Sequence, residues 1–233
     1  MILGLTAEEW AVVALSLRVS LVAVLLTLPP AYGLAVLLAR RRLPGRLLLD
    51  ALVHLPLVLP PVVTGWVLLL ALGRTGPVGR WLDETLGVTL VFHWTGAALA
   101  AAVMALPLMV RAMRLSIEAV DRRLVGAART LGATRWRAFL TITLPLSLPG
   151  ILAGAMLGFA RSLGEFGATI TFASNIAGQT RTLPLAIYSG LQLPGAEGQV
   201  ARLAVISIVL SLAALVVSEL LVRRSAGARA HVL

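Results

Sequence analysis

The sequence has no cysteine, no lysine and few charged residues of either sign. Without cysteine, the chain has no disulfide, no thiolate metal site and no cysteine nucleophile, while its redox compartment stays open. Only 13% of the 233 residues are charged, and 10 acidic residues stand against 20 basic ones, all of which are arginine. The phosphate-loop pattern GxxxxGK[ST] is absent as well, so we expect no nucleotide site of that type.

Apolar residues dominate what is present. They make up 59% of the chain, and the mean hydropathy is +0.95, values far above those of soluble domains. The chain is therefore predicted to be an integral membrane protein. Its net charge of +10 fits either binding to nucleic acid or orientation in a membrane, and the placement of the arginines separates the two.

Five apolar stretches reach the length of about 20 residues that a helix needs to cross a bilayer. They are residues 11–39, 47–72, 90–110, from 144–148 to about 172, and 200–222. In the second stretch, Pro56, Pro60 and Pro61 predict packing inside the bundle, where neighbours satisfy the freed carbonyls. The N-terminus has two acidic residues and no basic one before the first stretch, so we expect this stretch to be retained rather than cleaved as a signal peptide.

The arginines orient these spans. Residues 40–46, 111–137 and 223–233 together hold 14 of the 20 arginines, and arginine-rich loops of membrane proteins face the cytoplasm. We therefore expect an all-α membrane protein of about five transmembrane helices, with the N-terminus outside and the C-terminus inside. Nucleic-acid binding loses its support.

Two segments fall on the expected outer side. Residues 73–87 balance two arginines with Asp83 and Glu84 and are predicted to form a turn-rich loop. The apolar core of residues 182–193 is too short to span and contains Pro184 and Gly190. We expect it to form a short or partly inserted helix.

The largest basic and partly polar island, residues 126–145, lies in the second cytoplasmic loop. Gly132 predicts a break in a short amphipathic helix, and Thr134 predicts the N-cap of a second one. A helix–glycine–helix knob suits insertion into a groove on another protein, while an amphipathic interfacial loop without a partner is the alternative.

The same stretch, GAARTLGATRWRAFLTITLP, resembles the EAA loop of ABC importer permeases, E-A-A-x3-G-x9-I-x-L-P. Every spacing is intact, and Gly126 replaces the motif glutamate. In that family the loop is a coupling helix that seats in a cleft of a cytoplasmic ATPase subunit. The resemblance therefore implies ATPase coupling by Gly126, Ala127, Ala128, Arg129, Thr130, Leu131, Gly132, Ala133, Thr134, Ile142, Leu144 and Pro145.

Three other stretches are similar to permeases of molybdate importers: HLPLVLPPVV at residues 54–63, LPLMVRAMRL at 106–115 and FARSLGEFGATITF at 159–172. The resemblance implies a type I ABC importer permease fold in one domain, residues 1–233, with the coupling loop at about 118–145. It also implies a homodimer in the bacterial inner membrane, two copies of a separate ATPase, an external oxyanion-binding protein, and no cofactor. Tungstate, sulfate and thiosulfate are alternative cargoes.

Two charges lie within the fourth expected span. Arg161 and Glu165 stand four residues apart, and an unpaired charge there costs at least about 2.5 kcal/mol. They form either a structural ion pair, extending to Arg18 or Glu219, or part of an anion path together with Ser162 and Thr169. A more distant alternative is an intramembrane enzyme that uses Glu165 with a histidine, although no GxSxG or HExxH pattern is present.

Further small and polar residues accompany this span. Gly150, Gly154 and Gly158 predict close helix packing, within one subunit or across a dimer. Thr169, Thr171, Ser174 and Asn175 either cap a helix end or contact an oxyanion near the outer mouth. His54 and His93 lack a metal-ligand spacing.

Overall fold

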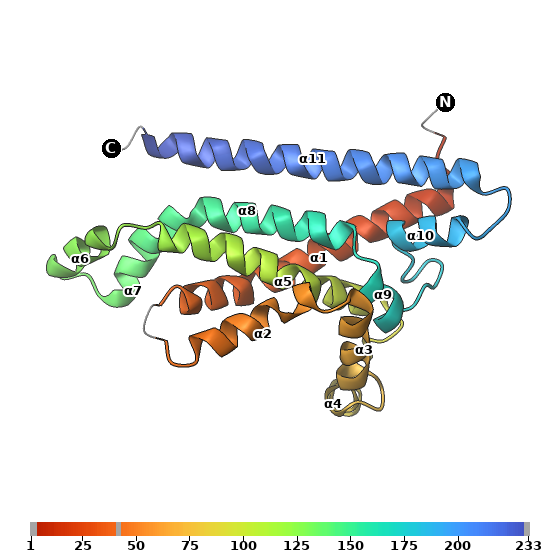
Figure 1. Cartoon of the computed structure of the whole chain (residues 1–233), viewed down its shortest axis with the longest axis horizontal. Helices are drawn as coiled ribbons and strands as arrows, with labels where there is room; N and C mark the ends of the chain where they lie inside the picture. Colours follow the sequence, from red (N-terminus) through yellow and green to blue (C-terminus); the bar gives the residue numbers. More distant parts are fainter. Residues whose placement is uncertain (1–3, 41–42, 231–233) are drawn as a thin grey trace.

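A computed structural model describes residues 4–40 and 43–230, with no side-chain description for residue 218 or residues 221–230. Within these residues the fold is all helical, as predicted (Figure 1). Arg41 and Arg42 of the first basic loop lie outside the described residues. The elements are α1 (Ala7–Leu38), α2 (Arg46–Val58), α3 (Pro61–Leu72), α4 (Pro77–Leu86), α5 (Trp94–Glu118), α6 (Arg122–Thr130), α7 (Arg135–Ala138), a π-helical turn η1 (Phe139–Thr143), α8 (Leu144–Leu163), α9 (Gly167–Phe172), α10 (Leu183–Gly190) and α11 (Glu197–Ala230).

By length and composition, the described helices supply four candidate membrane spans, or five if a bent pair of helices counts as one span. The four are α1, α5, the run from Arg135 to Leu163, and the part of α11 from Glu197 to Val217. The fifth joins α2 and α3, which are bent by 114°. Leu59 and Pro60 are extended at this bend, and Pro61 begins α3. Because proline has no backbone N–H, two adjacent prolines end one helix and permit the next to start.

The core forms around α5, which lies between α1 and α8 (Figure 1). Alanines cover much of its buried surface, at residues 97, 98, 100, 101, 102 and 105. On the facing side, α8 presents Gly150, Gly154 and Gly158. A Cβ on Gly150 would lie 2.2 Å from the Cβ of Ser116, and one on Gly158 would lie 2.6 Å from the sulfur of Met109. These glycines therefore pack within one subunit, the first of the two predicted alternatives.

At the end of the bundle opposite α6 and α7, polar contacts hold α1, α10 and α11 together. The Glu9 side chain is fully buried and pairs with Arg202 of α11 at 2.7 Å. Its other carboxylate oxygen accepts a hydrogen bond from the Thr6 backbone N–H, which completes the N-terminal cap of α1. The Ser16 hydroxyl accepts the backbone N–H of Leu183 at the start of α10. The segment at 182–193 thus contains a short helix, as predicted.

Two expectations about the spans and loops are wrong, and a third is not met within the single chain. Residues 73–87 are not a plain loop, because α4 forms there between Gly76 and a left-handed Gly87. The fourth span ends at Leu163 rather than near residue 172, since the chain breaks before α9. The second span is not enclosed within the single chain: in α2 and α3 only Val53, Thr64 and Gly65 are buried.

We predict that Gly150→Leu lowers the melting temperature of the purified chain by about 5 °C or more, since overpacking a helix contact costs about 1–3 kcal/mol or more. Gly33→Leu is the matched control, because a Cβ at this other helical glycine meets nothing within 4 Å. Thermal unfolding in detergent measures both. Equal losses in the two variants would contradict the close α5–α8 contact.

Candidate functional site: a coupling element and a membrane-buried ion pair

The predicted helix–glycine–helix knob is present at one end of the bundle (Figure 1). Asp121 caps α6 by accepting the backbone N–H of Arg123 at 2.8 Å. Gly132 follows α6 with φ +88°, a left-handed conformation that favours glycine. The Thr134 hydroxyl then accepts the backbone N–H of Arg137 and caps α7. Both sequence signals, the break and the second cap, are confirmed.

The knob carries apolar side chains on its surface. Leu131 is 89% exposed and Trp136 is 68% exposed, and no residue of α6 is buried. Within α6, Val125 and Ala128 are partly covered, whereas Leu131, which follows the helix, is not. A projecting leucine and tryptophan beside arginines form a surface of the kind found at protein interfaces.

The root of the knob joins α8 through the π-helical turn η1. Pro145, a motif residue, is the second residue of α8 and has no N–H to bond to the carbonyl four residues earlier. The Leu144 N–H instead bonds to the Phe139 carbonyl, five residues back, which is the π-helical pattern. The motif residues Ile142, Leu144 and Pro145 therefore lie at the junction between the knob and a membrane span.

An aromatic chain connects this root to α1. Trp136 stacks on Phe139 at 5.5 Å between ring centroids, and Phe139 lies 6.1 Å from Tyr32 of α1. The Tyr32 hydroxyl is 2.9 Å from the Ser147 hydroxyl of α8. The sequence analysis missed Tyr32, because its partner is 115 residues away and no local pattern marks the contact.

Arg161 and Glu165 form the predicted ion pair, with 2.6 Å between Nη1 and Oε2. The other oxygen of Glu165 accepts the backbone N–H of Ala168 at 2.8 Å, so the carboxylate holds the start of α9 as well. Glu165 is only 3% exposed, whereas the Arg161 side chain is 25% exposed. Arg18, a predicted further partner, instead lies 3.8 Å above the Trp94 ring.

Arg161 and Glu165 also line an open cavity of about 330 Å³ between α3 and the α8–α9 break. Pro61 and Val62 supply its α3 side. Ser162 and Thr169, which are close to this pair in the sequence, are buried but do not line the cavity. The Ser162 hydroxyl has no hydrogen-bond partner among the described residues. The structure thus places two of the four predicted path residues on one cavity wall.

The other polar candidates are engaged within the chain. Thr171 donates to the Gly167 carbonyl, and Asn175 donates to Ser189 while accepting from Arg181. Ser174 has φ +65°, and its carbonyl accepts a hydrogen bond from Thr180. These groups order the segment between α9 and α10.

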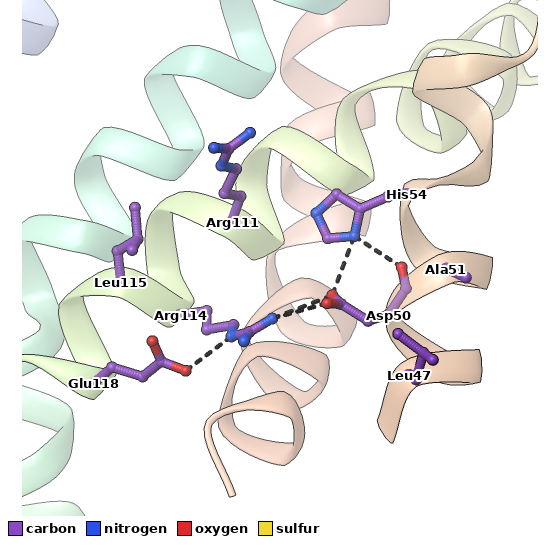
Figure 2. Close-up of a pocket in the computed structure, with 8 residues that line it drawn as sticks. All are labelled: Leu47, Asp50, Ala51, His54, Arg111, Arg114, Leu115 and Glu118. Carbon is purple, nitrogen blue, oxygen red and sulfur yellow. Dashed lines mark hydrogen bonds and ion pairs between the residues drawn. The ribbon is translucent and has the colours of Figure 1, made fainter. Parts of the chain in front are cut away.

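A charged network at the knob end of the bundle links α2 to α5 (Figure 2). Arg114 lies 3.1 Å from Asp50 and 2.9 Å from Glu118, and Arg46 also reaches Glu118 at 3.4 Å. His54 lies 3.3 Å from Asp50. The sequence analysis missed this network. The spacings Arg114–Glu118 and Asp50–His54 are four residues each and could have suggested the local pairs, but not the contact between helices.

Comparison with known proteins identifies the family. Residues 31–227 match the model of the binding-protein-dependent transport system inner membrane component. The chain belongs to this family. It is 59% identical over 221 residues to the molybdenum transport system permease protein ModB of Escherichia coli K12, covering 95% of this chain and 96% of that protein. The ModB protein of Haemophilus influenzae is 57% identical, with 93% and 94% covered.

More distant relatives and solved structures agree on the fold. The sulfate transport system permease protein CysT of Escherichia coli K12 is 42% identical over 68% of this chain and 57% of its own. A solved bacterial ABC transporter involved in alginate import aligns with a TM-score of 0.72 at 20% identity, over 94% of this chain and 80% of that one. An amino acid ABC transporter aligns with a TM-score of 0.63 over 93% and 94%. The fold is thus that of ABC importer membrane components.

We predict that Glu165→Ala destabilises the protein by about 3 kcal/mol or more, because it removes both the counter-charge of Arg161 and the hydrogen-bond acceptor of the Ala168 N–H. Glu165→Gln keeps an acceptor for the Ala168 N–H and should cost less. The control is Glu84→Ala, which breaks an exposed Arg80–Glu84 pair of the same spacing and should cost about 1 kcal/mol at most. Thermal unfolding measures the stability of all three variants. Equal losses in Glu165→Ala and Glu84→Ala would contradict the structural role of the buried Glu165 carboxylate.

Proposed function

We propose that the chain is the membrane-spanning permease subunit of an ATP-driven importer of molybdate. The observation that carries the proposal is the 59% identity to a molybdenum transport permease over 95% of the chain. The motif stretch at residues 126–145 supports it, because its helices project from the bundle with exposed Leu131 and Trp136. We take the whole chain, residues 1–233, as one transmembrane domain.

The orientation follows from charge. The Arg114 network lies near the C-terminal end of α5, which leads into the knob (Figure 1), and this end of the bundle would face the cytoplasm by the positive-inside rule. The N-terminus and α10 would then face the outside. An external binding protein would deliver the oxyanion there, and two copies of a cytoplasmic ATPase would bind the knobs of a permease homodimer.

The proline-rich bend between α2 and α3 supports a dimer, whereas exposed apolar side chains alone could equally be covered by lipid. Leu47, Leu48 and Val58 are among the strongly exposed apolar residues of this pair. The α2–α3 bend and its prolines would also be enclosed if this surface met a second copy, in keeping with the requirement that backbone groups in a membrane be satisfied by protein or by a water-filled path.

In this mechanism, closure of the ATPase pair displaces the knobs, and the membrane halves alternate between inward-open and outward-open states. Displacement of α7 reaches α8 through η1 and reaches α1 through Phe139 and Tyr32. At the far end of α8, the Arg161–Glu165 pair holds the break before α9 beside an open cavity. We infer that this pair shapes the wall of the anion path, with Arg161 as its partly exposed member.

Other functions are less well supported. Sulfate relatives match a smaller share of the chain at lower identity, so sulfate, thiosulfate and tungstate remain alternative cargoes for a competition assay. The carboxylate of Glu165 is engaged by Arg161 and by the Ala168 N–H, which argues against its use as the base of an intramembrane enzyme.

The direct test reconstitutes the permease with its ATPase and binding protein in liposomes. We expect ATP hydrolysis to rise when the binding protein carries molybdate, and molybdate to accumulate inside. Stimulation of ATP hydrolysis by sulfate alone under the same conditions would contradict the assignment of molybdate as the cargo. A permease that never co-purifies with an ATPase would contradict the mechanism.

We predict that Gly132→Asp weakens co-purification with the ATPase by about tenfold or more, because a new charge and a strained backbone are placed in the knob. Gly178→Asp is the matched control. Gly178 also has positive φ, at +74°, and open space around it, but it lies between α9 and α10. Both variants carry similar strain, so equal binding to the ATPase would contradict the role of the knob.

We also predict that Tyr32→Phe lowers the amount of substrate transported per ATP hydrolysed by about two- to fivefold, the size expected for one lost hydrogen bond. The change keeps the ring against Phe139 and removes only the hydroxyl that bonds to Ser147. Tyr188→Phe, which alters the other tyrosine of the chain, is the control. If transport per ATP is unchanged in Tyr32→Phe, α1 does not receive motion through this contact.

A further inference from the structure

A second cavity lies where the knob meets the bundle. It measures about 800 Å³, larger than the cavity at the Arg161–Glu165 pair. Residues of the bundle and residues of the knob both line the cavity. The bundle contributes the ends of α1 and α5, and the knob and its root contribute α6, α7 and η1. An occupant would therefore touch the moving part and the membrane part together.

Three arginines from three segments line this cavity. Arg40 follows the end of α1, Arg122 begins α6, and Arg135 begins α7. Among the described side chains, which exclude those of residues 218 and 221–230, the guanidinium groups of these three make no hydrogen bond or ion pair. The one acidic residue on the cavity wall, Glu118, is already paired with Arg114 and Arg46. The cavity thus has a net positive lining whose charges are not neutralised by the chain.

The rest of the lining is apolar. Val36, Ile117 and Phe139 are among its residues, and they belong to the helix ends that leave the membrane. Trp136 stacks on Phe139 beside the cavity and is largely exposed. Tryptophan side chains collect at the membrane–water interface and arginines in the cytoplasmic loops, so the lining has the mixed character expected of a site at the cytoplasmic surface of the bilayer.

We propose that this cavity binds the phosphate of an anionic phospholipid headgroup, with Arg40, Arg122 and Arg135 around the phosphate and the apolar wall against the glycerol and upper acyl chains. Guanidinium groups match phosphate oxygens well, and basic pockets between helices at the cytoplasmic surface favour anionic headgroups. A lipid held there links α1 to the knob, so it would set the resting position of the coupling element.

The inference rests on the proposed orientation and not on the cargo. A permease that carries sulfate instead of molybdate would keep this site, so failure of the cargo test leaves it standing. The shared ligand chemistry is a phosphate group, which a free phosphate ion could also supply, and the experiment separates the two sources.

The test measures lipid retention by native mass spectrometry on the full-length chain, with phosphatidylglycerol or phosphatidylcholine of the same acyl chains. The double variant Arg122→Gln/Arg135→Gln should retain phosphatidylglycerol about tenfold less well than the native chain, and Arg40→Gln should show a smaller loss in the same direction. Phosphatidylcholine should bind weakly to all of them.

The matched control is Arg129→Gln/Arg137→Gln, which removes the same charge from the same two helices at residues that do not line the cavity. Its phosphatidylglycerol retention should stay within about twofold of the native value. Equal losses of phosphatidylglycerol retention in both double variants would show that the lipid is attracted only by the overall positive charge, and would contradict a specific site. If inorganic phosphate binds the lipid-free chain with the same dependence on Arg122 and Arg135, a soluble anion is the ligand and the lipid assignment is wrong.

Discussion

The close approach of α5 and α8 is the contact on which the other features of the molecule depend. Alanines on one helix and glycines on the other bring the backbones together, with the Met109 carbonyl only 3.1 Å from where a Cβ of Gly154 would be. In a bilayer, lipid tails are as apolar as leucine, so association relies on such small-residue packing. Because α5 leads into α6 and α8 emerges from η1, this contact also fixes the two ends of the knob.

Several ion pairs in this protein join one helix to another or hold a break between helices. Glu9 and Arg202 join α1 to α11 at one end, Arg161 and Glu165 hold the α8–α9 break, and Arg114 bridges α2 and α5 at the other end. Breaking a buried pair leaves a charge without compensation, which is costly. The ion pairs therefore add to the close α5–α8 packing in specifying which helices are neighbours.

The sequence predicted features set by local chemistry. Apolar length located the spans, Gly132 and Thr134 located the break and cap of the knob, and a four-residue spacing located the Arg161–Glu165 pair. It failed at two local features, the break before α9 and the helix α4, and at contacts that depend on a distant partner. The apolar run through Phe172 reads as one span, but Glu165 bonds to Ala168 and starts a separate helix. Likewise, α4 forms in a stretch rich in glycine, and Asp50 and Tyr32 find partners on other helices.

The π-helical turn has a consequence for how the knob is aimed. A π turn holds one residue more than an α turn, and one residue of α-helix corresponds to about 100° of rotation. Because η1 separates α7 from α8, the direction in which α7 points is set by this extra residue as well as by the bundle. Removing the residue, or moving the π turn along the chain, would change the direction in which α7 meets the axis of α8, while the glycine-mediated contact between α5 and α8 stays in place.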